Sequence, residues 1–462
     1  MPSSESGPES RTKPKRTIGP KHRRDSRLSA GAVSSAEHVR RKVSRRLLPA
    51  LFAMFVLSFL DRSNVALVKS HLDVDLGIDA AAYGFGAGVF FVGYAVLGVP
   101  SNLVLHRVGA SRWLALIMGA WGVLSCSMAL VTGPTSFYVL RLLLGAAEAG
   151  FFPGAILYIT YWFPASERGR ATGLFQSAVA VASIVGNPLG GYLLGLRGAG
   201  LAGWQWMFVL EGLPTVLLAL AVPWLLTDRP AQARWLTEQQ RRELAERIAA
   251  EEPPPEAASR NGLAVLADSR IPRLMFVYFA IQLGLYGVTF WLPALVRRVG
   301  DLSDLATGTI TALPWLFALV GVLVLPWWSD RTGRRRAPLA LAMVLTVAGL
   351  VGAVLLPPAA AIASLCVAAF GFLGAQPVFW TVPPTILRGA QAAGTIALIS
   401  GFGNLGGFLG PYVMGVTESA TSSKTAGLHV LAAIVALGAV TAFSLRRLRT
   451  HRTGNAAHST SS

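Results

Sequence analysis

Residues 135–162 read TSFYVLRLLLGAAEAGFFPGAILYITYW, and this stretch decides what kind of fold the chain can form. It is apolar over more than the roughly 20 residues that a helix needs to cross the hydrocarbon core of a bilayer. Only Arg141 and Glu148 are charged within it. A surface helix of a soluble protein would show a polar face, so the stretch predicts a transmembrane helix that holds two ionisable groups.

Stretches of this kind recur along the chain between short polar breaks, and we count twelve. The sequence therefore predicts an all-α membrane protein with twelve transmembrane helices, six before and six after a longer break at 227–273. The expected spans are 47–69, 82–105, 113–132, 135–162, 171–196, 204–226, 274–296, 305–328, 337–357, 359–387, 390–417 and 425–445.

The composition excludes other classes of protein. Of 462 residues, 53% are hydrophobic and 14% are charged, whereas an average soluble domain carries about 25% charged residues. An ordinary soluble enzyme, a disordered chain and a disulfide scaffold are excluded. Cys126 and Cys366 lie far apart in apolar stretches and match no metal-ligand spacing, so we expect two free, buried thiols.

The segments outside the two bundles are polar. Residues 1–46 hold 13 Lys or Arg and four acidic residues, which predicts a disordered, basic cytoplasmic tail. Thr237 and Gln240 form a capping-box pattern within the central break, which predicts a short amphipathic helix there. The expected boundaries are 47–226 for the N-terminal bundle, 227–273 for a cytoplasmic linker, 274–447 for the C-terminal bundle and 448–462 for a cytoplasmic tail.

Basic residues favour the cytoplasmic side of a membrane protein. With the N-terminus in the cytoplasm, 34 of the 41 Lys and Arg residues fall on that side and five on the other. This predicts a multi-pass protein of the cell (inner) membrane with both termini cytoplasmic. The net charge of +18 is then a topology signal, and no nucleic acid partner is expected.

Two basic loops lie at equivalent positions in the halves, HRVGASR at 106–112 and DRTGRRR at 330–336. Repeated halves that enclose a site between them are a common transporter architecture. The alternative is two unrelated loops that both obey the orientation rule.

A few ionisable side chains lie inside the expected spans, all in the first half: Asp61, Arg62, Arg141, Glu148 and Glu211. Each costs about 3 kcal/mol or more in hydrocarbon, which makes it a functional candidate. Arginine suits bidentate recognition of carboxylates, so Arg62 and Arg141 are predicted to bind an anion. Asp61 and Glu148 are the predicted proton sites, with Glu148 favoured. The alternative is an ion-pair lattice that only fixes helix packing.

Arg141 and Glu148 are seven residues apart, which places them on nearly one face and about 10 Å apart along the helix. Asp61 and Arg62 are adjacent and point roughly 100° apart. Arg62 can therefore face a central site while Asp61 pairs with a neighbouring helix, or the two can exchange roles between states.

Neutral polar and aromatic residues also lie within the spans. They line a cavity, form hydrogen bonds from helix to helix or lie at the membrane interface: Gln176, Gln282, Tyr286, Gln376, Trp380 and Asn404. The sequence contains no Walker A loop, zinc spacing or nucleophile elbow, so neither nucleotide-driven transport nor a membrane-embedded enzyme is expected.

Several motifs resemble the major facilitator superfamily, and more narrowly its anion:cation symporter family of tartrate, sugar-acid and phthalate permeases. They are Leu60-Asp-Arg-Ser-Asn-Val65, Arg141-Leu-Leu-Leu-Gly-Ala-Ala-Glu-Ala-Gly-Phe-Phe-Pro-Gly154, the GWQWMFVLEGLP stretch at 203–214, FWLP at 290–293, SDRTG at 329–333 and GNLGGFLGP at 403–411.

The resemblance implies alternating access and proton-coupled uptake of organic anions. It places anion binding on Arg62 and Arg141 and proton transfer on Asp61 and Glu148. It also suggests polar substrate contacts at Asn404 and Gln176. The resemblance also implies a gating loop. The first loop departs from the family pattern at Asn102 and His106, so the predicted gating residues are those of the second loop, Asp330, Arg331 and Arg334. Span 5 is one residue off the antiporter spacing, which disfavours drug export.

We therefore expect a transporter, not an enzyme, that imports a sugar acid, tartrate-like dicarboxylate or aromatic carboxylate by proton symport. The candidate substrate contacts are Arg62, Arg141, Gln176, Tyr286, Gln376, Trp380 and Asn404. The expected partners are the anion, protons and the lipid bilayer. No metal and no cofactor beyond the proton gradient are expected, and the monomer is the expected functional unit. The alternative is a same-fold drug/proton antiporter or neutral-solute permease.

Overall fold

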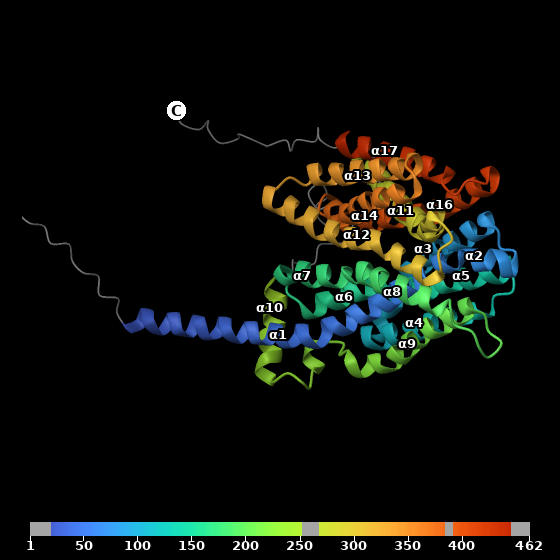
Figure 1. The fold of residues 1–462 in the computed structure, drawn as a ribbon. Helices are drawn as coiled ribbons and strands as arrows, with labels where there is room; N and C mark the ends of the chain where they lie inside the picture. Colours follow the sequence, from blue (N-terminus) through green and yellow to red (C-terminus); the bar gives the residue numbers. More distant parts are fainter. Residues whose placement is uncertain (1–19, 252–267, 384–390, 445–462) are drawn as a thin grey trace, which may run out of the picture.

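A computed structural model describes residues 20–251, 268–383 and 391–444, which form helices and no β-strand (Figure 1). Two helical halves lie side by side. The first half contains α1 (Pro20–Ser63), α2 (Val65–Leu76), α3 (Ala80–Val108), α4 (Ala110–Ser127), α5 (Pro134–Glu148), α6 (Phe151–Trp162), α7 (Ala165–Gln176), α8 (Ala178–Leu193) and α9 (Gly203–Leu225). The second contains α11 (Arg270–Val296), α12 (Asp304–Thr332), α13 (Arg336–Leu355), α14 (Pro358–Trp380), α16 (Gln391–Thr421) and α17 (Ala426–Ser444).

These helices account for the twelve expected spans. Ten helical segments in the described part of the chain are long and apolar enough to cross a membrane. The two other spans correspond to α7 with α8 and to the 31-residue α16. Three spans consist of two helices each: α1 and α2 meet at Asn64, α5 and α6 at Ala149 and Gly150, and α7 and α8 at Ser177. Pro153 explains the second break, since its ring removes a backbone donor and clashes with the carbonyl group of Ala149.

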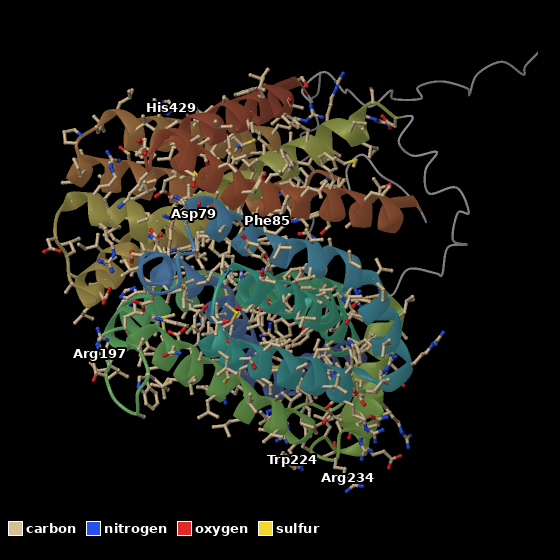
Figure 2. The ribbon with its side chains drawn as sticks, turned by 90° about the vertical axis from the view of Figure 1, so that its right-hand side faces the viewer. Asp79, Phe85, Arg197, Trp224, Arg234 and His429 are labelled. Carbon is tan, nitrogen blue, oxygen red and sulfur yellow. The ribbon has the colours of Figure 1, made fainter. Side chains whose placement is uncertain are left out.

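The exterior of the bundle is apolar, as expected of a surface in contact with lipid. Trp224 is 77% exposed on α9 (Figure 2), and Leu355 is 74% exposed at the end of α13. The charged side chains that the structure does bury are therefore exceptions that require an explanation.

The N-terminal segment differs from the disordered tail expected over residues 1–46. Helix α1 begins at Pro20 and is continuous with the first span. Val39, Val43 and Leu47 are buried at four-residue spacing, and Glu37 pairs with Arg41 at 2.7 Å on the exposed side. The burial of these three apolar side chains offsets the conformational entropy that residues 39–47 lose when they become helical. Residues 1–19 and the expected tail at 448–462 lie outside the described residues.

The linker contains the expected amphipathic helix, α10 (Glu238–Glu251). Its capping box is formed: the amide of Gln240 donates to Thr237 Oγ1 at 3.3 Å, and the amide of Thr237 donates to Gln240 Oε1 at 3.2 Å. Leu244 is buried. Helix α10 packs against α1, α6 and α7, and we call this end of the bundle the α10 end.

Glycine lets several helices approach one another backbone to backbone. A Cβ atom on Gly145 of α5 would lie 1.9 Å from the carbonyl oxygen of Phe90 on α3. Between the halves, a Cβ atom on Gly415 of α16 would lie 2.3 Å from the carbonyl oxygen of Ala80, and one on Gly191 of α8 would lie 2.5 Å from that of Asp304. These approaches bring α3 against α16 and α8 against α12.

Candidate functional site

A buried ion pair lies between α1 and α5. Arg62, at the last turn of α1, pairs with Glu148, the last residue of α5. Ser58, one turn before Arg62 on α1, donates to the same Glu148 oxygen at 2.5 Å. The structure therefore brings together two of the residues that the sequence selected by burial.

Arg62 also reaches across to the second half. Its Nη1 donates to the hydroxyl oxygen of Tyr286 on α11 at 3.1 Å, and the Tyr286 ring packs on Phe91 of α3 with 4.3 Å between centroids. The ion pair is therefore located where the two halves meet.

Arg141 lies beside this pair and is 1% exposed. Its guanidinium carbon is 4.9 Å from the centroid of the Phe90 ring, and that of Arg62 is 5.0 Å from the same ring. Arg141 donates to the carbonyl oxygens of Gly86 at 3.4 Å and Ala87 at 3.2 Å. No carboxylate of the described residues lies within ion-pair distance of it. Two buried guanidinium groups thus face a single paired carboxylate.

Asp61 points away from this cluster into the first half. It accepts hydrogen bonds from Ser125 of α4 at 2.7 Å and from Thr215 of α9 at 2.9 Å. Adjacent residues on a helix diverge by about 100°, and in this structure Arg62 faces the centre while Asp61 bonds to neighbouring helices.

The neutral residues predicted to contact the substrate are less closely grouped than the charged ones. Gln376 of α14 donates to Gln282 of α11 at 2.8 Å, a bond from helix to helix within the second half. Trp380, at the end of α14, packs on Tyr278 with centroids 4.8 Å apart. Gln176 and Asn404 are partly buried, and no contact in the described part of the chain joins either of them to Arg62 or Arg141.

The second basic loop makes local contacts. Asp330 pairs with Arg335, a residue that the sequence interpretation did not select. The Arg331 guanidinium lies 5.2 Å from the Trp327 ring, and Arg334 is exposed. Gly333 ends α12 with φ +67°, a backbone conformation that glycine adopts without strain.

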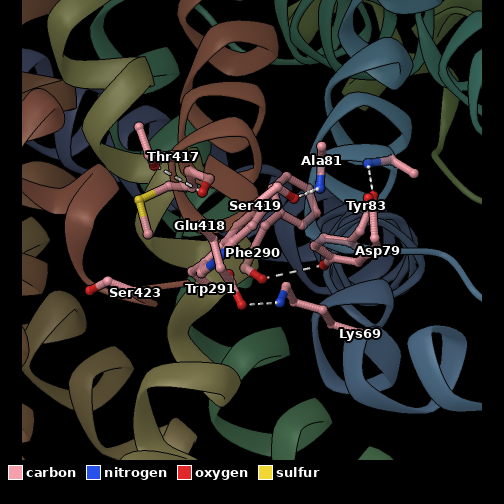
Figure 3. Close-up of polar contacts among 12 residues, drawn as sticks. Lys69, Asp79, Ala81, Tyr83, Phe290, Trp291, Thr417, Glu418, Ser419 and Ser423 are labelled. Carbon is pink, nitrogen blue, oxygen red and sulfur yellow. Dashed lines mark hydrogen bonds and ion pairs between the residues drawn. The ribbon is translucent and has the colours of Figure 1, made fainter. Parts of the chain in front are cut away.

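A polar network at the opposite end of the bundle joins the halves, and the sequence interpretation missed it (Figure 3). Lys69 of α2 pairs with Glu418 of α16 at 2.9 Å, and Trp291 of α11 donates to the other Glu418 oxygen at 2.5 Å. The Tyr83 hydroxyl donates to the carbonyl oxygen of Phe290 at 3.3 Å. We call this the Glu418 end.

A second contact between the halves lies at the same end. Asp304, the first residue of α12, pairs with Arg297 and lies 3.5 Å from His71 of α2. Two pairs of an acidic and a basic side chain join the halves among the described residues, Lys69 with Glu418 and His71 with Asp304, and both lie at the Glu418 end. No such pair joins the halves at the α10 end among the described residues.

A two-halved bundle of twelve transmembrane helices with buried charges at its centre defines a membrane transport protein. The chain belongs to the Major Facilitator Superfamily, whose family model matches residues 51–411. Because members of this family are transporters, the expectation that the chain is not an enzyme is confirmed.

The chain is similar to known relatives over most of its length. It is 41% identical to a protein of Agrobacterium vitis named "Putative tartrate transporter", over 88% of this chain and 91% of the relative. It is 39% identical to a "Quinolone resistance transporter" of Acinetobacter baumannii, over 87% and 93%. Its fold matches a bacterial homologue of the human lysosomal transporter Spinster, solved inward-facing and unoccupied, with a TM-score of 0.72, 18% identity and coverage of 89% and 97%.

Proposed function

We propose that the protein imports a small organic anion together with protons by alternating access. The observation that carries the proposal is Arg141, a buried guanidinium beside Arg62 that has no carboxylate partner in the described structure. A buried cation is costly unless an opposite charge compensates it. A substrate carboxylate between the two guanidinium groups would supply that charge.

Glu148 is the proposed proton acceptor because it competes with the substrate for Arg62. In this structure Glu148 holds Arg62. Protonation of Glu148 would remove its charge and free the Arg62 guanidinium for the anion. Asp61 is the second proposed proton site, linked to the first because it is adjacent to Arg62 in the chain. The Agrobacterium relative supports a small carboxylate, such as tartrate or a sugar acid, as substrate.

We place the α10 end in the cytoplasm, in the inner membrane of the cell. The segregation of Lys and Arg residues along the sequence supports this orientation. With this orientation, the contacts at the Glu418 end support a proposed role in holding the two halves together at the outer face.

The Glu418 contacts give a prediction about this closure. Glu418→Gln removes the charge that pairs with Lys69 and weakens the bond from Trp291, so we expect the Glu418 end to open more often. A partly exposed pair contributes about 1 kcal/mol, which changes the ratio of the two states roughly five-fold. The distribution of distances between spin labels at Val74 and Thr421, measured by double electron-electron resonance, should then gain a longer component. Glu238→Gln, which breaks an exposed pair with Arg242 within α10, is the control, and an unchanged distribution in Glu418→Gln would contradict the closing role.

Uptake into proteoliposomes tests the proposed function directly. The probes are labelled tartrate, a six-carbon sugar acid and benzoate, each with an acidic exterior, with equal pH, and with a protonophore. We expect at least one anion to accumulate only under the pH gradient and to lose accumulation with the protonophore. Uptake that ignores the gradient would contradict proton symport. Accumulation only under the inverted gradient would favour export, the alternative that the Acinetobacter relative raises.

A further inference from the structure

Glu211 is a buried carboxyl group to which the proposed cycle gives no task. It lies on α9 about 12 Å along the helix from Gly203, and it is 3% exposed. Both of its carboxyl oxygens are shielded from solvent, and neither accepts a hydrogen bond of good geometry from the described residues. This distinguishes it from Asp61 and Glu148, which both accept hydrogen bonds.

Among the described residues, no basic side chain lies within ion-pair distance of the Glu211 carboxyl group. The polar and charged neighbours of the carboxyl group are Asn64, at the junction of α1 and α2, and Asp61 of α1. The Asn64 side chain is 4% exposed and is likewise without a partner of good geometry. Helix α8 contributes Gly190, whose Cβ position would be 3.4 Å from Glu211 Oε1, and α2 contributes Leu67 at the same glycine. Helix α4 contributes the Cys126 thiol, which packs at Gly212.

Electrostatics decides the charge of a carboxyl group in such a place. An ionised carboxylate that is buried without a cation, and that has only the neutral Asn64 amide beside it among the described hydrogen-bond donors, is unfavourable by several kcal/mol. The acidic group of Asp61 nearby makes a second negative charge still less favourable. A neutral, protonated carboxyl group avoids both penalties, and its own hydroxyl can then donate to the amide oxygen of Asn64.

We propose that Glu211 is a third proton-binding site and carries its proton in the conformation described here. The proposal rests on the proposed function, to which it adds one exchangeable proton. The site is connected to the others: Thr215, one helical turn beyond Glu211, donates to Asp61, and Asp61 adjoins Arg62, which holds Glu148. Three carboxyl groups thus follow one another across the first half.

Infrared difference spectroscopy tests the protonation without any substrate. The purified, reconstituted protein at neutral pH should show the C=O stretch of a protonated carboxylic acid in a dry environment. We expect this band to disappear in Glu211→Gln and to persist in Asp61→Asn and in Glu148→Gln. Labelling with 13C-glutamate should shift the band, while 13C-aspartate should not, so the wild-type protein alone remains informative if Glu211→Gln does not fold.

Three results would overturn the assignment. They are the lack of any such band in the wild type, a band that Glu211→Gln leaves unchanged, and a band that vanishes when sodium replaces potassium in the buffer. The last would assign the site to a sodium ion.

Transport provides the second readout. In proteoliposomes with tartrate, or with another anion that the uptake assay identifies, Glu211→Gln should lower the number of protons moved per substrate by one and leave counterflow exchange active. An unchanged stoichiometry would overturn the role in coupling. Loss of proton coupling in the wild type would instead refute the proposed function, and the infrared band would still report on Glu211.

Discussion

Arg141→Ala is expected to abolish saturable uptake and to weaken binding of the organic anion about a hundredfold. In the proposed complex the substrate carboxylate lies between two guanidinium groups, and truncating one partner of a buried charge pair costs about 3 kcal/mol. That loss corresponds to a factor of roughly one hundred in the dissociation constant. The measurement is the shift of thermal stability with increasing concentration of the anion, together with initial rates of uptake.

The substrate-free protein should tolerate this substitution. Arg141 donates only to the carbonyl oxygens of Gly86 and Ala87, so no ion pair is broken by its removal. Arg62→Ala differs, because it leaves Glu148 buried without its cation and should lower the melting temperature of the free protein. Arg141→Lys keeps the charge without the planar fork and should recover part of the affinity. Arg242→Ala, which removes an exposed guanidinium group of α10, is the control, and full uptake by Arg141→Ala would refute the anion site.

The sequence was sufficient to predict the helical bundle and the charged residues at its centre. Apolar length is a strong signal for a helix in a bilayer, because the backbone must satisfy its own hydrogen bonds there. The cost of burying charge also singled out Arg62 and Glu148, which the structure then joins. The divergence of adjacent side chains anticipated that Arg62 and Asp61 would face different helices.

Other features depend on contacts between distant segments and were not predictable. Lys69 and Glu418 are 349 residues apart and lie at the ends of the expected spans 47–69 and 390–417, where a charge is unremarkable in sequence. The Asp330 carboxylate could reach any of several arginines in its loop, and only the αL turn at Gly333 brings Arg335 to it. The extension of α1 before residue 47 depends on the burial of Val39 and Val43, which a basic composition conceals.

The second large effect is expected for Glu148→Gln, which should eliminate uptake against a gradient while exchange of the anion continues. Glutamine keeps the size of the side chain and can still accept from Ser58, but it cannot ionise and compete for Arg62. In the wild type, the proposed proton on Glu148 would free Arg62, so anion affinity should rise as pH falls. In Glu148→Gln the affinity should stay at its low-pH level at every pH.

This follows from linkage, since a proton that raises the affinity for the anion must have its own affinity raised by the anion by the same factor. A side chain that cannot bind the proton removes the effect of the proton on the anion and the effect of the anion on the proton. The pH gradient then cannot drive accumulation of the anion through this site. Anion affinity measured from pH 5 to pH 8 and accumulation under a pH gradient provide two independent readings. The control is Glu167→Gln, which removes the charge of a partly exposed glutamate that pairs with Arg247. If Glu148→Gln kept the wild-type pH dependence, coupling would have to reside in Asp61 or Glu211, and the competition between Glu148 and the substrate for Arg62 would be wrong.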